Sequence, residues 1–590
     1  MTYGAVSLLV DVAVPEIGID ALTYESDVRL SEGVRVIVEV MRTKHAGFVL
    51  GESVKGLPHG VKAKPIEGVI DDEPAVDRDV WELAMWAAKV SMRGTAAALK
   101  ASLPAKFYSG GKIIPPPQIP VTSSSFTERN FFNPFDSERV NFFVDELKQG
   151  ARTLILFPRK DEAKSFFMSL PDELKAESFL WFPDVMESWK KIRSGNVRIV
   201  IAPPGGVFAP LIPEKIIVED ESSPAYVIPH TLNLSARSLA GHRTQFLKAE
   251  LILAGRIPSL KTYIRTHPRE SLKPDRRNII LADIRQSRKE TIPGIEGSIP
   301  LTYTLTSRTH KELAQGHNVI WILNREGEAS EVFCENCGES VRCPKCGGSM
   351  RARNDGDMLK CVRCGMIREL PPVCGKCGYH LLIGRRPGLD ALAKIAGKYF
   401  PRVNVYDERV NPNAFGISGL VLSTTRGLKL CGRISPSLVA WLDLDSELWR
   451  LEHDNRFNVY SMLLESYWRG RTRDSERKVL VQARRKGMRL AEFIARGWEK
   501  FLPDELRMRS EFLLPPYGYI VEVETSSKPL RDDIITLLMD SGMFVMDPGD
   551  DSRPLYVSCE FLEAVSKILE PGKFLRNTKS QYINITVRSE

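Results

Sequence analysis

The sequence predicts a multidomain α/β protein with a β-rich N-terminal domain and a small α+β C-terminal domain. Three observations support this fold class. The chain has 590 residues, which at about 100–200 residues per domain corresponds to about three to five domains. Short apolar strands alternate with helical stretches through its middle, a pattern typical of parallel sheets covered by helices. Eight of its ten cysteines lie within one block of 44 residues.

The composition excludes several classes of protein. Hydrophobic residues make up 43% of the chain, so it can form cores and is not disordered as a whole. No apolar run approaches the ~18–20 residues of a membrane helix, and the N-terminus lacks the basic segment of a signal peptide. We therefore expect a soluble, cytoplasmic protein with no membrane partner. The net charge of +8 is mild for this length and gives only a weak indication of a polyanionic partner.

The expected domain boundaries lie where this pattern changes. Alternating strands and an amphipathic helix around Trp81–Lys89 form the N-terminal domain, and a stretch rich in Gly, Pro and Ser follows as a linker. Beyond it, two sets of strands alternate with helices, and the cysteine block interrupts the second set. The expected parts are an N-terminal domain (1–108), a linker (109–127), a first lobe (128–268), a second lobe (269–332 and 379–500), a cysteine insertion (333–378) and a C-terminal domain (501–590).

Short apolar runs identify the strands of each part. In the N-terminal domain the expected strands are Val6–Val14, Val34–Val40 and Gly47–Gly51. In the first lobe they are Thr153–Phe157, Val197–Ala202, Lys215–Val218 and Leu251–Ala254. In the second lobe they are Asn318–Leu323, Leu381–Gly384, Gly419–Ser423 and Leu438–Asp443. In the C-terminal domain they are Tyr519–Thr525, Pro554–Val557 and Gln581–Val587.

The cysteine block consists of four C-x-x-C pairs and predicts two zinc sites. Each pair directs two thiolates at one centre, two pairs complete a tetrahedral Cys₄ site, and the glycine after each pair suits a tight turn. Redox-active pairs do not occur four at a time, and no spacing here matches a ferredoxin cluster. Because every ligand is a thiolate and no position is open to water, we expect the two Zn²⁺ ions to be structural.

The pairing of these cysteines has two solutions. Sequential pairing joins the first pair to the second across only five residues, a short span in which to wrap a metal. Nested pairing needs only one hairpin inside another, and we favour it. The nested ligand sets are Cys334, Cys337, Cys374 and Cys377 for the first zinc, and Cys343, Cys346, Cys361 and Cys364 for the second.

An acid cluster, Glu219-Asp220-Glu221, directly follows the apolar run at 215–218. In many ATPases acids in this position hold Mg²⁺, so the cluster raises the question of ATP binding. An ATPase also needs the phosphate loop G-x-x-x-x-G-K-[ST]. No Gly-Lys pair in this chain continues into Ser or Thr, and the segment where the loop belongs reads Asn130-Phe-Phe-Asn-Pro-Phe-Asp136, without a glycine.

Several motifs together resemble the bacterial replication restart protein PriA (primosomal protein N′) family. Asn324-Arg-Glu-Gly327 resembles the lead-in to that family's zinc block, and the four cysteine pairs match its spacing and its nested ligand sets. The segment 419–445 resembles the strands around the family's fifth helicase motif, and Leu514-Pro-Pro-Tyr517 resembles the signature that opens its C-terminal domain. The resemblance covers most of the chain and implies two RecA-like, helicase-type lobes with a double-zinc insertion in the second.

The departures from this family imply that its ATP-dependent 3′→5′ DNA helicase activity is lost here. The family's D-E-E-H reads E-D-E-S at 219–222, its G-S-A-T is replaced at 254–257, and the final motif, at 465–472, keeps one of two arginine-finger positions. Since phosphate loop, metal ligands and arginine fingers act as a unit, we expect no catalytic residue and neither ATP nor Mg²⁺. The degenerate nucleotide site then consists of Glu219, Asp220, Glu221 and Arg469.

Basic residues are the candidates for DNA contact. Arg42 and Lys44 form a turn in the N-terminal domain, which matches the family's 3′-end-binding domain in layout. Nine Lys and Arg and only two acids lie at 469–489, where the family's second lobe faces nucleotide and DNA. The alternative interpretations are a solvated hairpin tip and a solvated helix face. The candidates in the second stretch are Arg469, Arg471, Arg484, Arg485, Lys486 and Arg489.

The resemblance implies a DNA-binding protein of replication restart and primosome assembly that recognises stalled or arrested forks. On this hypothesis it is a platform for reloading the replicative helicase, without ATPase or helicase activity. The expected partners are branched or forked DNA, primosome and helicase-loading proteins, and single-strand DNA-binding protein. Two alternatives stay open: an ATP-dependent 3′→5′ DNA helicase with a non-standard nucleotide site, and a zinc-stabilised protein-interaction scaffold without affinity for DNA.

Overall fold

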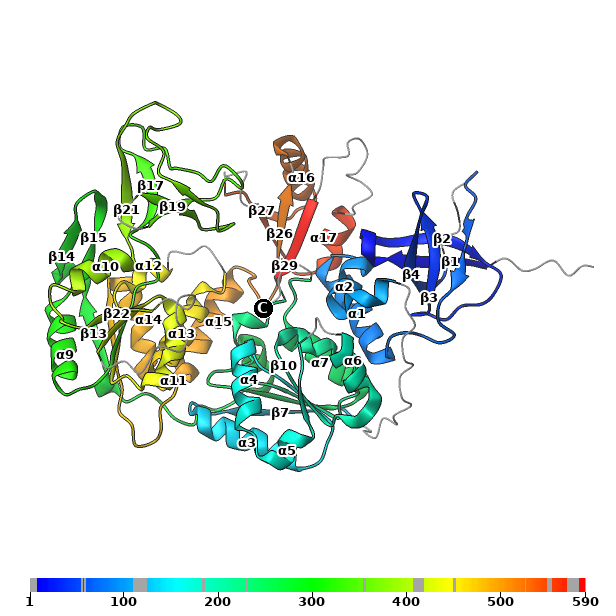
Figure 1. Cartoon of the computed structure of the whole chain (residues 1–590), viewed down its shortest axis with the longest axis horizontal. Coiled ribbons are helices and arrows are strands. Elements are labelled where there is room, and N and C mark those ends of the chain that lie inside the picture. Colours follow the sequence, from blue (N-terminus) through cyan, green and yellow to red (C-terminus); the bar gives the residue numbers. More distant parts are fainter. Residues whose placement is uncertain are drawn as a thin grey trace, which may run out of the picture. The chain divides into compact units, whose positions relative to one another are not determined.

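The computed structural model divides the chain into two compact units (Figure 1). The first contains residues 1–132, 139–268 and 507–590, and the second contains residues 133–138 and 269–506. The described residues run from 8 to 588, except for 55–56, 58–59, 110–124, 183–185, 229–231, 354–356, 407–418, 449–452, 526, 549–553 and 570–582. Most of the expected linker therefore lies outside the described residues. Within the described ranges, no helix has the length and apolar character needed to cross a membrane.

The N-terminal domain contains a six-stranded, mostly antiparallel sheet in the order β5-β2-β1-β4-β3-β6. Buried and partly exposed side chains alternate along its strands, as the sequence predicts, and two helices follow the sheet. The sequence analysis missed β2, because its polar residues interrupt any apolar run. The elements are β1 (Leu8–Val14), β2 (Ile19–Ser26), β3 (Arg35–Val40), β4 (Thr43–Glu52), β5 (Lys64–Pro65), β6 (Gly68–Val69), α1 (Arg78–Ser91) and α2 (Thr95–Ser102).

The first lobe contains a parallel six-stranded sheet in the order β7-β12-β11-β8-β10-β9. Its central strands are buried on both faces, which explains their nearly continuous apolar sequences. The strands are β7 (Thr127–Phe132), β8 (Thr153–Leu156), β9 (Ser178–Leu180), β10 (Ile199–Ala202), β11 (Lys215–Val218) and β12 (Glu250–Gly255). The helices are α3 (Asp136–Lys148), α4 (Lys160–Ser169), α5 (Asp172–Ala176), α6 (Met186–Lys191), α7 (Ala236–Leu247) and α8 (Leu260–Thr266).

The two faces of this sheet contribute to two different cores. Ile155 of β8 packs in one core with Phe143 of α3 and Phe166 of α4. Its neighbour Leu154, which points to the opposite face, belongs to a core that also contains Trp81 of α1. The N-terminal helices therefore share a core with the first lobe.

The second lobe contains another parallel sheet, in the order β13-β25-β24-β16-β23-β22. Together the two parallel sheets confirm the prediction of two α/β lobes. The strands are β13 (Ile279–Asp283), β16 (Val319–Ile322), β22 (Val403–Val405), β23 (Leu420–Ser423), β24 (Leu438–Trp441) and β25 (Lys478–Ala483). The helices are α9 (Tyr303–Ala314), α10 (Leu389–Ala396), α11 (Cys431–Ile434), α12 (Leu444–Leu448), α13 (Asn455–Trp468), α14 (Arg485–Arg496) and α15 (Trp498–Glu511).

The cysteine block forms part of a separate seven-stranded sheet in the order β14-β15-β21-β17-β18-β19-β20. The expectation that Leu381–Gly384 belongs to the parallel sheet of the second lobe is wrong. This segment forms β21 (Leu382–Pro387), which pairs antiparallel with β17 and is only half-buried. A short apolar run does not indicate which sheet it joins. The other strands are β14 (Arg288–Ile292), β15 (Ile295–Leu301), β17 (Ala329–Cys334), β18 (Met350–Arg353), β19 (Met358–Cys361) and β20 (Ile367–Glu369).

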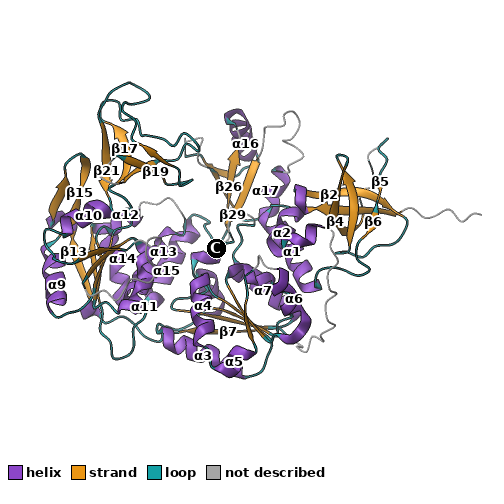
Figure 2. Cartoon of the chain, in the orientation of Figure 1, coloured by secondary structure: helices purple, strands orange, loops and turns teal. Residues whose placement is uncertain are grey.

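The C-terminal domain is a small α+β domain with the sheet order β27-β28-β26-β29 (Figure 2). All three strand pairs are antiparallel, and Val521 and Val557 of the sheet share a core with Ile534 of α16. The elements are β26 (Tyr519–Thr525), α16 (Lys528–Asp540), β27 (Phe544–Met546), β28 (Leu555–Cys559), α17 (Leu562–Ile568) and β29 (Ile583–Arg588).

Candidate functional site

The eight cysteines of the block form two groups of four in the second unit. Within each group, the sulfur atoms lie within 4.8 Å of one another. The groups are the nested ones, Cys334, Cys337, Cys374 and Cys377 in one, and Cys343, Cys346, Cys361 and Cys364 in the other. The strands explain the nesting: the β18–β19 hairpin lies between the two inner pairs, and Cys334 at the end of β17 lies opposite Leu382 of β21.

Each C-x-x-C pair makes the same tight turn. The N–H of the glycine after the pair donates to the carbonyl of the first cysteine, as from Gly338 to Cys334 and from Gly347 to Cys343, both at 2.9 Å. The four glycines have φ between +68° and +72°, where a side chain would be strained. This local geometry explains why a glycine follows every pair.

The cysteine groups fit zinc. Four sulfur–sulfur distances are 3.6 Å for Cys334–Cys377, 3.7 Å for Cys337–Cys374, 3.6 Å for Cys343–Cys364 and 3.5 Å for Cys346–Cys361. A tetrahedron of sulfurs about 2.3 Å from a central Zn²⁺ has edges of about 3.8 Å. Four thiolates fill each coordination sphere, so the donor set suits a closed structural site and leaves no position for a reacting water.

The acid cluster of the first lobe follows β11, and each of its carboxylates pairs with an arginine. Arg139 Nε donates to Glu219 Oε1 at 2.8 Å. Arg256 Nη1 donates to Asp220 Oδ2 at 3.2 Å. Arg237 Nη1 donates to Glu221 Oε2 at 3.1 Å.

Burial makes these pairs strong structural contacts. Glu221 is 2% exposed, and it also accepts the Ser259 N–H at the start of α8, at 2.6 Å. Burial raises the pKa of Glu219 even though Arg139 opposes that rise. The Tyr226 hydroxyl donates to the Glu219 and Leu156 carbonyls at 2.6 and 2.8 Å, which further fixes the end of the strand. The cluster is therefore a set of three ion pairs, of which those of Glu219 and Glu221 are buried and that of Asp220 is half-buried.

The connection between β7 and α3 takes the place of a phosphate loop. β7 lies beside β12, and β12 lies beside β11, so the connection starts at the same sheet edge as the acid cluster. It consists of Asn133, Pro134 and Phe135 alone. Asn133 Oδ1 accepts the Phe135 N–H at 3.0 Å, and Phe135 is buried. This three-residue turn has no glycine-rich backbone to surround a triphosphate.

In the second lobe, Asp445 and the arginine-finger position Arg469 also form contacts within the protein. Asp445 accepts the Gly487 N–H at 3.2 Å and the Arg484 N–H, so it caps the start of α14. Arg469 pairs with Glu465 one helical turn earlier on α13, and only 14% of its side chain is exposed. Arg471 donates two hydrogen bonds to the Ser475 carbonyl and stacks on Tyr467.

The basic stretch at 469–489 is not one continuous face, because the buried strand β25 divides it. Arg477 within it is 2% exposed and donates to backbone carbonyls, including that of Arg469 at 2.6 Å. At the start of α14, Arg484, Arg485 and Arg489 are exposed and form no ion pair with another described residue. The side chain of Lys486 lies outside the described part of the structure.

The basic turn of the N-terminal domain is the tip of the β3–β4 hairpin. Met41 and Arg42 occupy the turn with φ of +49° and +67°, and Arg42 is exposed. Lys44 pairs with Glu67 at 2.7 Å, a contact that raises its pKa. Of the two predicted residues, Arg42 is therefore the one better placed to donate hydrogen bonds to a phosphate.

Sequence reasoning missed the three arginines of the acid cluster. Arg139 precedes Glu219 by 80 residues, and no local pattern connects the two. Arg256 could have indicated its pair with Asp220, because it lies in the segment 254–257, where the family has small and hydroxylated residues.

The chain is similar to known replication restart proteins. A family model described as the 3′DNA-binding domain (3′BD) of PriA matches residues 10–104. The chain is 23% identical to the replication restart protein PriA of Thermotoga maritima, over 58% of this chain and 48% of that protein. It is 21% identical to that of Haemophilus influenzae (68% and 58%) and 22% identical to that of Bacillus subtilis (62% and 48%). The chain thus spans about half the length of the curated relatives it matches.

Proposed function

We propose that this chain is a member of the PriA family of replication restart proteins and that it binds forked DNA as a non-catalytic platform. The DNA-binding part is supported by the match of residues 10–104 to a 3′DNA-binding domain. Replication restart is the function in the names of its relatives. On this proposal the chain recognises stalled or arrested forks and helps to reload the replicative helicase.

The observation that carries the non-catalytic part is the pairing of every carboxylate in the acid cluster with an arginine. A Mg²⁺ ion at Glu219, Asp220 or Glu221 would have to displace a guanidinium from a buried or half-buried ion pair. The Asn133–Phe135 turn offers no cradle for the phosphates that such an ion bridges. Arg469, held by Glu465, is not free to stabilise a transferred phosphoryl group. We therefore propose that the lobes are a scaffold without ATP or Mg²⁺.

We further propose that each cysteine group holds one structural Zn²⁺. When bound, each metal ion would cross-link the two C-x-x-C turns of its group. The thiolates of Cys334, Cys337, Cys374 and Cys377 would bind one ion, and those of Cys343, Cys346, Cys361 and Cys364 the other. The proposed role is to keep the seven-stranded sheet folded.

A combined measurement of ATP turnover and fork binding tests the proposal. We expect no DNA-stimulated ATP hydrolysis and no heat of ATP binding in calorimetry. We also expect affinity for a fluorescent fork that falls as salt rises, because phosphate contacts release counterions. DNA-stimulated turnover above about 1 s⁻¹, a typical enzymatic rate, would favour a helicase with a non-standard nucleotide site. Fork affinity too weak to measure at low salt would favour a zinc-stabilised scaffold without DNA affinity.

The proposed protein partners are primosome and helicase-loading proteins and single-strand DNA-binding protein, in the cytoplasm. Family membership is the support for this part. It is tested by measuring binding of the purified chain to each protein of the same organism, with and without fork DNA. We expect at least one complex that forms more tightly on the fork, and binding to none of them would contradict the platform role.

A further inference from the structure

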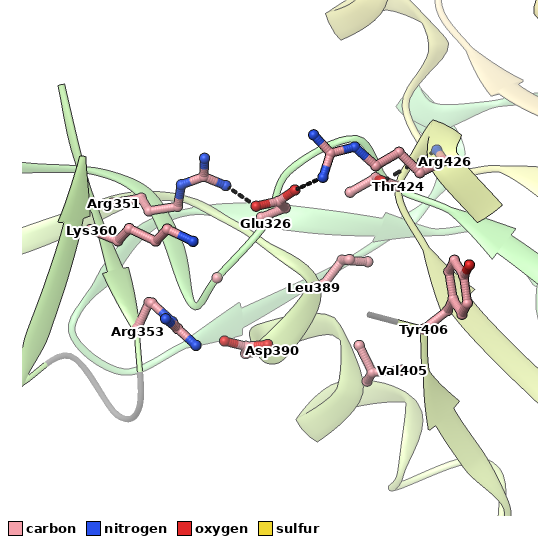
Figure 3. A pocket seen from close by; sticks show the side chains of 11 residues that line it. Glu326, Arg351, Arg353, Lys360, Leu389, Asp390, Val405, Tyr406, Thr424 and Arg426 are labelled. Atoms are coloured by element: carbon pink, nitrogen blue, oxygen red, sulfur yellow. Dashed lines mark hydrogen bonds and ion pairs between the residues drawn. The ribbon is translucent and has the colours of Figure 1, made fainter. Parts of the chain in front are cut away.

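A polar pocket of the second unit has had no part in the sites above (Figure 3). It lies between the cysteine-bearing sheet and the second lobe and has a volume of about 100 Å³. A space of that size holds a few water molecules and admits one small polar group. Its charged lining consists of Arg351, Arg353, Lys360, Arg426, Glu326 and Asp390.

Three of these cations lie on one face of the β18–β19 hairpin. Arg351 is directly opposite Lys360 in the strand register, and Arg353 is two residues further along β18. The opposite face of the hairpin packs Met350 and Leu359 into a hydrophobic core. Like charges in directly opposite positions destabilise a hairpin, so this arrangement calls for a negative partner.

Two carboxylates, of Glu326 and Asp390, supply negative charge among the described lining residues. Glu326 lies between two arginines and accepts from Arg351 Nη1 and, at 3.4 Å, from Arg426 Nη1, as the dashed lines in Figure 3 show. Among the described residues that line the pocket, four are basic and two are acidic, an excess of positive charge. Arg353 forms no ion pair with a described residue, and Arg351 Nε is buried without a hydrogen-bond partner among them.

We propose that this pocket binds a phosphate group. Guanidinium groups present planar sets of N–H donors that match phosphate oxygens, and here they come from two different parts of the fold. The pocket has room for a phosphate group. The group is either a phosphodiester of a DNA strand or a free phosphate. In its DNA form the inference rests on the proposed function, because the strand would then pass between the cysteine-bearing sheet and the second lobe.

The test compares Arg353→Ala and Lys360→Ala with Arg363→Ala, an exposed arginine of the same sheet region outside the pocket. Two probes are titrated against each full-length variant, inorganic phosphate by calorimetry and a labelled oligothymidylate by fluorescence anisotropy. Zinc content and circular dichroism serve as checks that each variant is folded. We expect each pocket variant to weaken binding of at least one probe about tenfold, the loss of one charge-assisted hydrogen bond. Arg363→Ala should bind like the wild type.

The two probes separate the sources of the phosphate. Loss of oligothymidylate binding, with a salt dependence reduced by about one phosphate contact, assigns the pocket to DNA. Loss of phosphate binding, with oligothymidylate affinity unchanged or absent, assigns the pocket to a free phosphate. If the wild type has no affinity for oligothymidylate, that result contradicts only the proposed function. If the wild type binds neither probe, or if folded pocket variants bind both as the wild type does, the phosphate site is wrong. In the latter case DNA binding by the chain still stands.

Discussion

The arginine partners of the acid cluster in the first lobe decide what that cluster can do. Arg139 and Arg237 are buried, and Arg256 is partly buried. Three acids directly after a buried strand satisfy the sequence pattern of a Mg²⁺ site. In the structure each of these carboxylates forms an ion pair with a guanidinium group, that of Arg139, Arg256 or Arg237. Removing one partner of such a pair leaves an uncompensated buried charge, which is why these acids stabilise the fold.

Replacing Glu221 with Ala tests this structural role. We expect a loss of about 3–5 kcal/mol in the free energy of unfolding, because Arg237 and the Ser259 N–H lose their partner in a buried environment. Urea denaturation measures the change. Fork affinity, measured where both proteins are folded, should stay the same.

Glu187→Ala is the matched control, since it removes an exposed glutamate that lies 3.6 Å from Lys190. Its effect should stay below about 1 kcal/mol. Equal urea midpoints for Glu221→Ala and Glu187→Ala would show that the buried pairs contribute little.

Among the structural elements, the nested hairpins of the cysteine block give the sharpest test of zinc pairing. Under the nested arrangement, Cys334 and Cys374 belong to the same group. The double variant Cys334→Ser/Cys374→Ser should therefore retain one zinc per chain, because the inner group is complete. Cys334→Ser/Cys343→Ser damages both groups and should retain none. Zinc content by mass spectrometry of the purified chain measures both.

Sequential pairing reverses these two results. It leaves Cys334→Ser/Cys374→Ser without a complete site and Cys334→Ser/Cys343→Ser with one. Cys431→Ser is the control, since that buried cysteine lies outside both groups and its loss should leave two zincs.

The exposed start of α14 is the part of the basic stretch that remains available to DNA. We expect Arg485→Ala/Arg489→Ala to weaken fork binding and to lower the slope of log affinity against log salt by about two, one for each lost phosphate contact. Fluorescence anisotropy at several salt concentrations measures both quantities. Arg496→Ala, at the other end of the same helix and paired with Glu492, should change neither. An unchanged slope in the double variant would show that this surface does not contact DNA and is a solvated helix face.

In the molecule as a whole, the N-terminal domain is joined to the first lobe by buried polar contacts as well as by the shared core. Arg243, fully buried, donates two hydrogen bonds to Asp79 of α1 and others to three backbone carbonyls of the lobe. Arg193 of the lobe donates to the Ala75 carbonyl and lies 3.6 Å from Asp77. A protein held together in this way places its N-terminal domain in a defined position on the lobe.

The stability of this junction should depend on pH through Asp77. Burial raises the pKa of Asp77 to about 6, an effect that outweighs the lowering by Arg193. Because the folded state holds the proton more tightly than the unfolded state, this contribution is full below about pH 4 and is lost as the pH rises through about 6. The wild type should therefore lose about 3 kcal/mol of unfolding free energy relative to Asp77→Asn between pH 4 and pH 8.

Urea denaturation of both proteins across this pH range measures that difference. Asp72→Asn, which removes an exposed carboxylate nearby, should show a far smaller change with pH. A difference for Asp77→Asn that stays constant would mean that the carboxylate ionises normally in the folded protein. A difference that rises with pH would mean that its pKa is lowered there.

Much of the fold could be predicted from the sequence, because the signals are local. The C-x-x-C spacing and the glycines after each pair specify the four turns of the cysteine block within a few residues. Continuous apolar strands such as β8 and β11 indicate a sheet buried on both faces. The same kind of reading missed β2, with its polar residues, and placed β21 in the wrong sheet, because strand pairing is not encoded in a short run.

The sequence by itself determined the four metal-binding turns, the alternation of strands and helices, and the absence of a phosphate-loop motif, since each depends on neighbouring residues. Only the tertiary structure decided how distant residues meet. It paired Arg139 with Glu219, divided the basic stretch with β25, and brought Arg353 and Arg426 to one pocket. The physical reason is that ion pairs and pockets form between side chains whose positions follow from packing, and packing acts over separations that local patterns do not record.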